Sequence, residues 1–123
     1  MMDEERFSFK KRLKSFSYAL SGIQILLTKE HNARIHGVAA VAAIILGVYL
    51  HLSPIEWCLI AIAIGLVFAF ELVNTALEQL ADFVCIDRHA SIKRVKDLAA
   101  GAVLVSAIVS LCIAGFVFLP KFV

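Results

Sequence analysis

Apolar residues gather in three long blocks along the chain, with short polar segments between them. The blocks cover residues 35–52, 55–84 and 97–119. The second block is fully apolar only to about residue 70, and its helical pattern then continues with polar residues on one face. Each block is long enough for a helix that crosses a bilayer, which takes about 20 residues. The pattern predicts an all-α membrane protein with three transmembrane helices, separated first at Ser53 and Pro54 and ended by Pro120.

The segment before these blocks, residues 7–29, has a different pattern. Its apolar residues recur at alternating spacings of four and three, which is one face of a helix. They are Phe9, Leu13, Phe16, Leu20, Ile23 and Leu27, and the basic residues among them are Lys10, Lys11, Arg12 and Lys14. Basic, aromatic-rich helices of moderate hydropathy are typical of the interface of an anionic membrane. We expect an amphipathic surface helix over residues 7–29, the alternative being a helix packed on a soluble core.

The composition supports a membrane protein. Hydrophobic residues make up 61% of the 123 residues, whereas soluble domains contain about 45–50%, and the mean hydropathy is +0.88. We therefore expect residues 1–123 to form one membrane-embedded domain, with no soluble module and no nucleic-acid partner. The N-terminus lacks the apolar segment of a cleavable signal peptide. The three cysteines show neither a CxxC pair nor metal-ligand spacing.

The basic residues are distributed unevenly between the two sides of a three-span topology. Eleven of the 12 lysines and arginines fall on one side and only Lys121 on the other. The eleven are Arg6, Lys10, Lys11, Arg12, Lys14, Lys29, Arg34, Arg88, Lys93, Arg94 and Lys96. Because cytoplasmic segments carry the excess of Lys and Arg, we expect a cytoplasmic N-terminus, a cytoplasmic loop over residues 85–97, and a C-terminus outside. In a bacterium this is the cytoplasmic (inner) membrane.

The second block ends in a polar stripe within the string FAFELVNTALEQLADF. Each helical residue advances by about 100°, so Glu78 and Asp82 lie roughly 20° to either side of Glu71, and Asn74 about 60° away. A carboxylate at the membrane boundary is costly, and intramembrane acids usually serve a cation, a proton relay or catalysis. Carboxylate and carboxamide oxygens suit Mg²⁺. The alternative is that these acids only meet basic residues of neighbouring loops.

Two further features fall on the same side of the membrane. Glu30 follows the surface helix, so it can approach the stripe from a neighbouring helix. Lys96 and Asp97 open the third span, where a lysine and a helix N-terminus together favour phosphate. The alternative for Lys96 is ordinary anchoring at the membrane surface.

The third span carries small residues at a strict spacing of four. They are Ala102, Ser106, Ser110 and Ala114. Such a face permits close approach of helices in the membrane, so self-association is one interpretation and chance placement in an alanine-rich helix is the other.

Spacing alone indicates an acidic, cation-binding site at the membrane interface. One function class that fits is an enzyme acting there, and the rival is a small cation or proton transporter with a carboxylate-lined path. A transporter predicts acids within more than one span, but residues 37–50 and 98–119 contain none. A non-catalytic assembly factor needs no acidic stripe at all.

Two strings connect these features to a known family. ELVNTALEQLAD at residues 71–82, followed by KDLAAGAVL at residues 96–104, resembles the prokaryotic diacylglycerol kinase family, which includes the undecaprenol kinases. The resemblance covers nearly the whole chain. It implies a small homotrimeric inner-membrane lipid kinase that transfers the γ-phosphate of MgATP to a lipid hydroxyl.

The resemblance also implies roles for individual residues. Glu71 matches the base that takes the proton from the lipid alcohol, with Asn74 beside it in the catalytic stripe. Asp97 is the acid next to the lysine of the second motif. The positions that match ATP-binding residues are Tyr18, Glu30, Glu78, Asp82 and Lys96, and two of them, Glu30 and Glu78, match the carboxylates that hold the divalent metal.

Some positions depart from the diacylglycerol kinase pattern. His36 stands where that branch carries an acid, and the NTA of residues 74–76 replaces its NSA. These departures and the AAGAVL ending are more similar to the branch that contains the undecaprenol kinases, which leaves undecaprenol and diacylglycerol both open as substrates. Asn32 and Arg34 are possible contacts of lipid or nucleotide, and the sequence assigns them no role.

Overall fold

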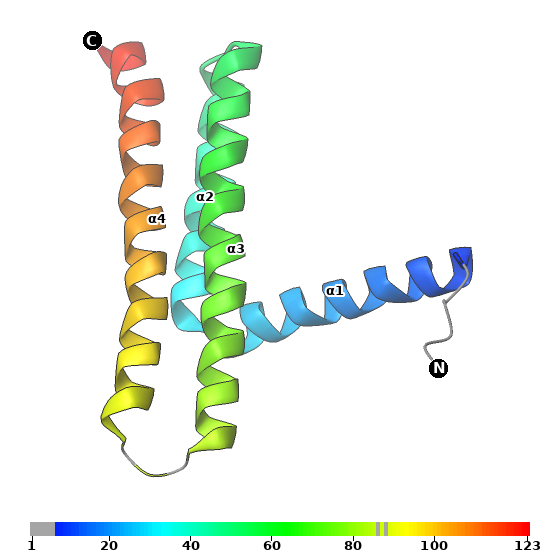
Figure 1. The fold of residues 1–123 in the computed structure, drawn as a ribbon. Coiled ribbons are helices and arrows are strands. Elements are labelled where there is room, and N and C mark those ends of the chain that lie inside the picture. The colour runs from blue at the N-terminus through cyan, green and yellow to red at the C-terminus, as the bar shows by residue number, and fades with distance from the viewer. Residues whose placement is uncertain (1–6, 86, 88) are drawn as a thin grey trace.

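A computed structural model describes residues 7–85, 87 and 89–123 of the chain. Its elements are the helices α1 (Phe9–Lys29), α2 (His31–Tyr49), α3 (Pro54–Val84) and α4 (Ala90–Phe122) (Figure 1). Arg6 and Arg88, which the charge distribution assigns to the cytoplasmic side, lie outside the described residues. The prediction of an all-α protein is confirmed.

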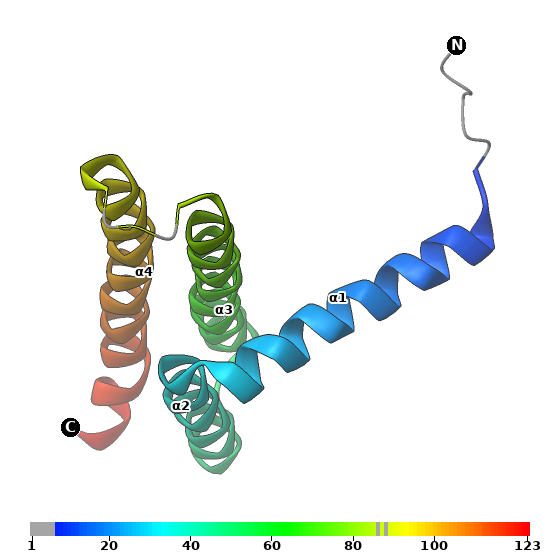
Figure 2. The ribbon, with the colours of Figure 1, turned by 90° about the horizontal axis from the view of Figure 1, so that it is seen from below.

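Helices α2, α3 and α4 run alongside one another, and α1 leaves this bundle sideways from the start of α2 (Figures 1 and 2). Each of the three bundled helices is long and apolar enough to cross a membrane. α3 has 31 residues, which at about 1.5 Å per residue is roughly 46 Å, whereas the apolar core of a bilayer is about 30 Å thick. The end of α3 and the start of α4 continue past the level of α1 (Figure 1).

The start of α4 differs from the predicted loop over residues 85–97. The helix begins at Ala90, capped by His89, whose Nδ1 accepts a hydrogen bond from the Ser91 amide at 3.1 Å. The segment is polar because the α3–α4 hairpin extends beyond the apolar part of the bundle, and a helix in water needs no apolar run. The prediction that Pro120 ends the last helix is also wrong by two residues, because α4 continues to Phe122. A proline this near the end of a helix disturbs only the last turn.

The other two helix junctions are short. A single extended residue, Glu30, separates α1 from α2, so α2 begins at His31, four residues before the predicted start of the first apolar block. α3 begins with a capping box, in which the Ser53 hydroxyl accepts from the Glu56 amide at 3.2 Å and the Glu56 carboxylate accepts from the Ser53 amide at 3.0 Å. The Lys121 ammonium also lies 3.0 Å from Glu56, which ties the end of α4 to the start of α3.

The small-residue face of α4 packs on α3 of the same chain. Ser110 Oγ donates to the Ala63 carbonyl of α3 at 2.9 Å, and Ser106 is 2% exposed. The close approach that the spacing predicts is therefore present, but within the chain. This face gives no support to self-association, and an expectation of a trimer rests on the family resemblance alone.

Gly47 is the tightest contact between α2 and the turn that follows it. A Cβ at this position would lie 2.7 Å from Trp57 Cη2 and 2.9 Å from Leu52 Cδ1. We expect Gly47→Ala to lower the free energy of unfolding by about 1–3 kcal/mol, the usual cost of overpacking. Thermal unfolding in detergent, followed by circular dichroism, measures this change.

Gly65→Ala is the matched control, because a Cβ there meets nothing within 4 Å. A helical Gly→Ala change without a clash should stabilise the protein slightly, by about 0.5–1 kcal/mol. Equal behaviour of the two variants would show that the Trp57 contact does not constrain the fold.

Candidate active site

The acidic stripe lies on one face of α3 and passes from a buried to an exposed end. Glu71 is 3% exposed, Asn74 and Glu78 are partly buried, and the Asp82 side chain is 66% exposed. Asn74 Nδ2 lies 3.4 Å from Glu78 Oε1, as two residues one turn apart on a helix should. The shared face predicted from helical spacing is present.

Side chains from outside α3 meet this stripe. The Lys96 ammonium of α4 forms an ion pair with Asp82 and also interacts electrostatically with Glu78. Glu30, between α1 and α2, and Glu78 both interact electrostatically with Glu71. The structure therefore brings Glu30, the stripe and Lys96 into one polar region, although they come from distant parts of the sequence.

The corner between α1 and α2 fixes the position of Glu30. Arg34 Nε donates to the Leu27 carbonyl at 2.8 Å, and its Nη2 donates to the Thr28 carbonyl. These carbonyls end α1, where a cation is favourable. Leu26 and Ala33 are 1% and 0% exposed and close the corner from the apolar side. Arg34 thus has a structural role that the sequence did not reveal, while Asn32 is exposed.

Tyr18 and Asp97 do not join the polar region. Tyr18 is 64% exposed on α1, twelve residues or roughly 18 Å of helix before Glu30. The Asp97 carboxylate lies 2.6 Å from Lys93 on α4 and is 61% exposed. Lys96 is also further into α4 than predicted, because the helix starts at Ala90. An argument from the helix N-terminus therefore no longer applies to it.

Two side chains that sequence reasoning left without a role lie at the buried end of the stripe. His36 Nε2 of α2 is 3.4 Å from Glu71 Oε1. Thr75, one turn after Glu71, is 7% exposed. Helical spacing places Thr75 about 40° from Glu71, so its position was predictable, whereas the approach of His36 depends on how α2 packs.

The buried polar atoms of this end lack hydrogen-bond partners among the described residues. They are Glu71 Oε1, Asn74 Oδ1 and Thr75 Oγ1. Buried polar groups in proteins are nearly always paired, and an unpaired one calls for an explanation such as a catalytic role or a bound water or ion. The three oxygens are therefore available to a substrate, a metal or water.

A metal site made by the chain alone is absent from the described residues, where no group of three or more His, Cys, Asp and Glu side chains could hold an ion. Mg²⁺, however, is usually held by one or two carboxylates together with substrate phosphates and water. Glu30 and Glu78, which both interact electrostatically with Glu71, supply such a pair. With the free Asn74 Oδ1, the oxygen donors fit a magnesium ion shared with a phosphate.

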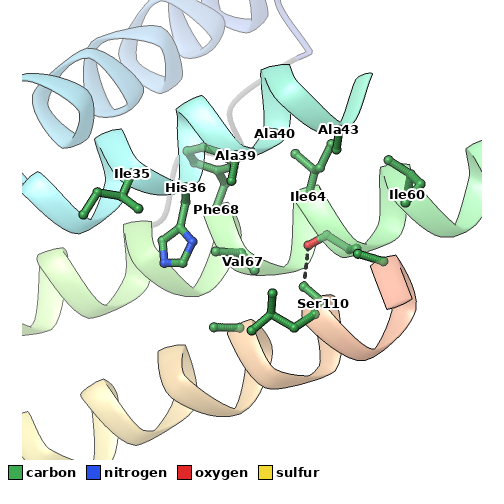
Figure 3. Close-up of a pocket in the computed structure, with 14 residues that line it drawn as sticks. Ile35, His36, Ala39, Ala40, Ala43, Ile60, Ile64, Val67, Phe68 and Ser110 are labelled. Carbon is green, nitrogen blue, oxygen red and sulfur yellow. Dashed lines mark hydrogen bonds between the residues drawn. The ribbon is translucent and has the colours of Figure 1, made fainter. Parts of the chain in front are cut away.

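Two cavities lie at the two ends of the stripe. The first, of about 310 Å³, is lined by apolar residues of α2, α3 and α4, and His36 belongs to its wall (Figure 3). The second, of about 400 Å³, lies between the end of α3 and the start of α4 and is lined by charged and polar residues that include Asp82, Lys93 and Lys96. An apolar cavity and a polar cavity with both lysines and aspartates in its wall are thus separated by the carboxylates.

Comparison with known proteins agrees with this geometry. The family model of prokaryotic diacylglycerol kinase matches residues 17–118. The chain is 41% identical over 118 residues to the undecaprenol kinase of Bacillus subtilis, covering 96% of each chain. It is 40% identical over 109 residues to a diacylglycerol kinase of Synechocystis, covering 88% of this chain and 62% of that one.

The diacylglycerol kinase of Escherichia coli is 28% identical over 102 residues, or 83% of this chain and 84% of that one. The family match includes both strings, at residues 71–82 and 96–104, and runs from within α1 to near the end of α4. The resemblance found in the sequence is therefore confirmed. The chain belongs to the prokaryotic diacylglycerol kinase family and is a membrane phosphotransferase with an alcohol group as acceptor.

Proposed function

We propose that the protein transfers the γ-phosphate of MgATP to the hydroxyl of a membrane lipid alcohol, with undecaprenol as the preferred acceptor and diacylglycerol as the alternative. The observation that carries this proposal is the position of Glu71, a buried carboxylate between an apolar cavity and a polar one that contains two lysines. The apolar cavity suits the hydrocarbon chain of a lipid alcohol, and the polar cavity suits the phosphates of a nucleotide. The full-length match to an undecaprenol kinase supports the choice of acceptor.

In this proposal Glu71 is the general base. It accepts the proton of the lipid hydroxyl as the lipid oxygen bonds to the γ-phosphorus, while the bond from that phosphorus to the bridging oxygen breaks and ADP leaves. The Glu71 carboxylate is buried and its Oε1 has no hydrogen-bond partner among the described residues, so the carboxylate has the capacity to accept the proton. Phosphoryl transfer depends mainly on positioning and charge stabilisation, so Asn74, one turn away, serves to orient the reacting groups.

Lys96 and Asp82 are proposed to act on the nucleotide. Both line the polar cavity, and the Lys96 ammonium there can exchange its ion pair with Asp82 for the phosphates of ATP. Asp82 keeps this ammonium oriented before ATP binds. Tyr18 and Asp97 are weaker proposals, because both are exposed and apart from the stripe.

Glu30 and Glu78 are proposed as the protein ligands of Mg²⁺. When bound, the ion offsets the charge of the phosphates and of the stripe itself. The two carboxylates come from different elements, so their separation depends on the α1–α2 corner. Arg34 maintains that corner through its bonds to the α1 carbonyls.

We also propose that α1 lies in the membrane interface on the cytoplasmic side. Its apolar face, including Phe9, Leu13 and Phe16, is exposed in the single chain at 75%, 63% and 69%. α1 leaves the bundle sideways beside α3, and the end of α3 continues beyond it (Figure 1). The distribution of basic residues supports a cytoplasmic N-terminus and an outer C-terminus, and the family resemblance supports a homotrimer.

A kinase assay with several alcohols tests the proposed function. The purified protein in lipid or detergent, given MgATP, is compared on undecaprenol, diacylglycerol and short-chain alcohols. We expect undecaprenol to have a kcat/KM at least about tenfold above diacylglycerol, a difference of about 1.4 kcal/mol in the activation free energy. Preference for diacylglycerol would reverse the choice of acceptor, and no transfer to any alcohol would overturn the proposal.

A further inference from the structure

The catalytic carboxylate proposed above is unusually deep for a charged group. Glu71 is 3% exposed, and its Oε1 has no hydrogen-bond partner among the described residues. A buried carboxylate without partners is strongly unfavourable. Its two charged neighbours on the stripe side, Glu30 and Glu78, are also acids and so worsen the position of Glu71 rather than help it.

One side chain offers the missing donor. The His36 imidazole approaches Glu71 from α2, with Nε2 3.4 Å from Oε1, and it is 29% exposed against 4% for the carboxylate. The contact lacks the geometry of a hydrogen bond. Such bonds at active sites are often long before the substrate binds and shorten in the complex.

The fold holds His36 in place beside Glu71. Two residues before His36, Arg34 is bonded to the end of α1, and Ala33 is completely buried in the same corner. The first turns of α2 are therefore fixed to α1. His36 also forms part of the wall of the apolar cavity (Figure 3), so it touches both Glu71 and the space assigned to the lipid.

We propose that His36 is a positioning residue for the transfer reaction. Its imidazole, with a proton on Nε2, donates to Glu71 and fixes which carboxylate oxygen is presented to the hydroxyl of the lipid in the apolar cavity. His36 neither takes nor gives a proton in the reaction, and it acts through the orientation of the base. This inference rests on the proposed function, and it adds a residue of α2 to the site formed by the stripe of α3, Glu30 and Lys96.

Three substitutions separate this role from simple packing. Glutamine can present an N–H where His36 has Nε2, asparagine places its amide nearer the position of Nδ1, and leucine fills similar space without a donor. We expect His36→Leu and His36→Asn to lower kcat for undecaprenol about 10- to 100-fold. This is the range seen when a side chain that orients a metal ligand through a hydrogen bond is removed. His36→Gln should retain at least about a third of kcat, and the affinity for MgATP should be unchanged in all three.

His51→Asn is the matched control for His36→Asn, because His51 is exposed in the α2–α3 turn at the opposite end of the bundle and asparagine tolerates its φ of 55°. It should behave as the wild type. A variant that fails to fold is identified by its elution volume in detergent and by loss of nucleotide binding. Among the folded variants, a higher kcat in His36→Gln than in His36→Leu supports the positioning role. Equal kcat in His36→Gln and His36→Leu would overturn the positioning role. The proposed function would still stand if the wild type phosphorylates the lipid. An inactive wild type would overturn both.

Discussion

Glu71→Gln is expected to lower kcat for lipid phosphorylation by about 10²- to 10⁴-fold, the contribution of a general base. The change removes the proton acceptor but keeps the size of the side chain. Because Glu71 is 3% exposed and its Oε1 is unpaired, the uncharged amide should be tolerated at least as well as the carboxylate. The KM for MgATP should stay close to that of the wild type, since the nucleotide is assigned to the other end of the stripe. Initial rates at saturating lipid and ATP measure the effect.

Glu56→Gln is the control for this experiment. It makes the same chemical change at the opposite end of α3, where Glu56 caps the helix and pairs with Lys121, and glutamine can also serve in a capping box. Its kcat should equal that of the wild type. If Glu71→Gln retained wild-type turnover, Glu71 would not be the base. If it failed to fold, Glu71 would be a structural residue.

Glu78→Gln and Glu30→Gln are expected to raise the Mg²⁺ concentration needed for half-maximal activity. Even the outer partners of a metal site change metal affinity by about 10- to 100-fold, so the loss of a direct ligand should shift this concentration by at least about tenfold. Turnover should recover partly at high Mg²⁺, because the phosphates of ATP still supply oxygens. A titration of initial rate with Mg²⁺ at fixed ATP measures the shift.

The two variants distinguish a metal role from a general loss of charge. Both residues interact electrostatically with Glu71, so removing either acid also changes the environment of the base. A change confined to kcat, with an unaltered Mg²⁺ requirement, would assign Glu30 and Glu78 to that electrostatic effect and not to the metal. Glu56→Gln should leave the Mg²⁺ requirement unchanged.

The stripe was predictable because it depends on one helix. Residues 71 to 82 follow a single helical period, so their shared face comes from the sequence alone. The three bundled helices were predictable for the same reason, since the length and hydropathy of each segment determine whether it can cross a membrane.

Features that depend on packing between helices were not predictable. His36 reaches Glu71, and Arg34 binds the carbonyls that end α1, only because α1 and α2 meet at a particular corner. Ser106 and Ser110 lie on a face of small residues, which can pack either on another chain or on a helix of the same chain. In the structure this face packs on α3 of the same chain.

The prediction for the start of α4 is wrong for another reason. The segment from residue 90 to 97 is polar, and a polar segment between two apolar blocks predicts a loop. A helix that extends into water has no apolar period along its exposed part, and Ala90 begins such a helix after the His89 cap. The same extension provides Lys96 with its contact to Asp82, so the error concerns the element that carries half of the polar cavity.

The central claim is that the γ-phosphate passes from ATP to a lipid hydroxyl beside Glu71. The most direct measurement gives ATP labelled at the γ-phosphorus to the purified protein in vesicles that contain undecaprenol and follows the label. The account predicts label in the lipid fraction with the wild type and with Glu56→Gln, and almost none with Glu71→Gln, although all three bind MgATP. Label that appears only as inorganic phosphate, or transfer that continues in Glu71→Gln, would contradict it.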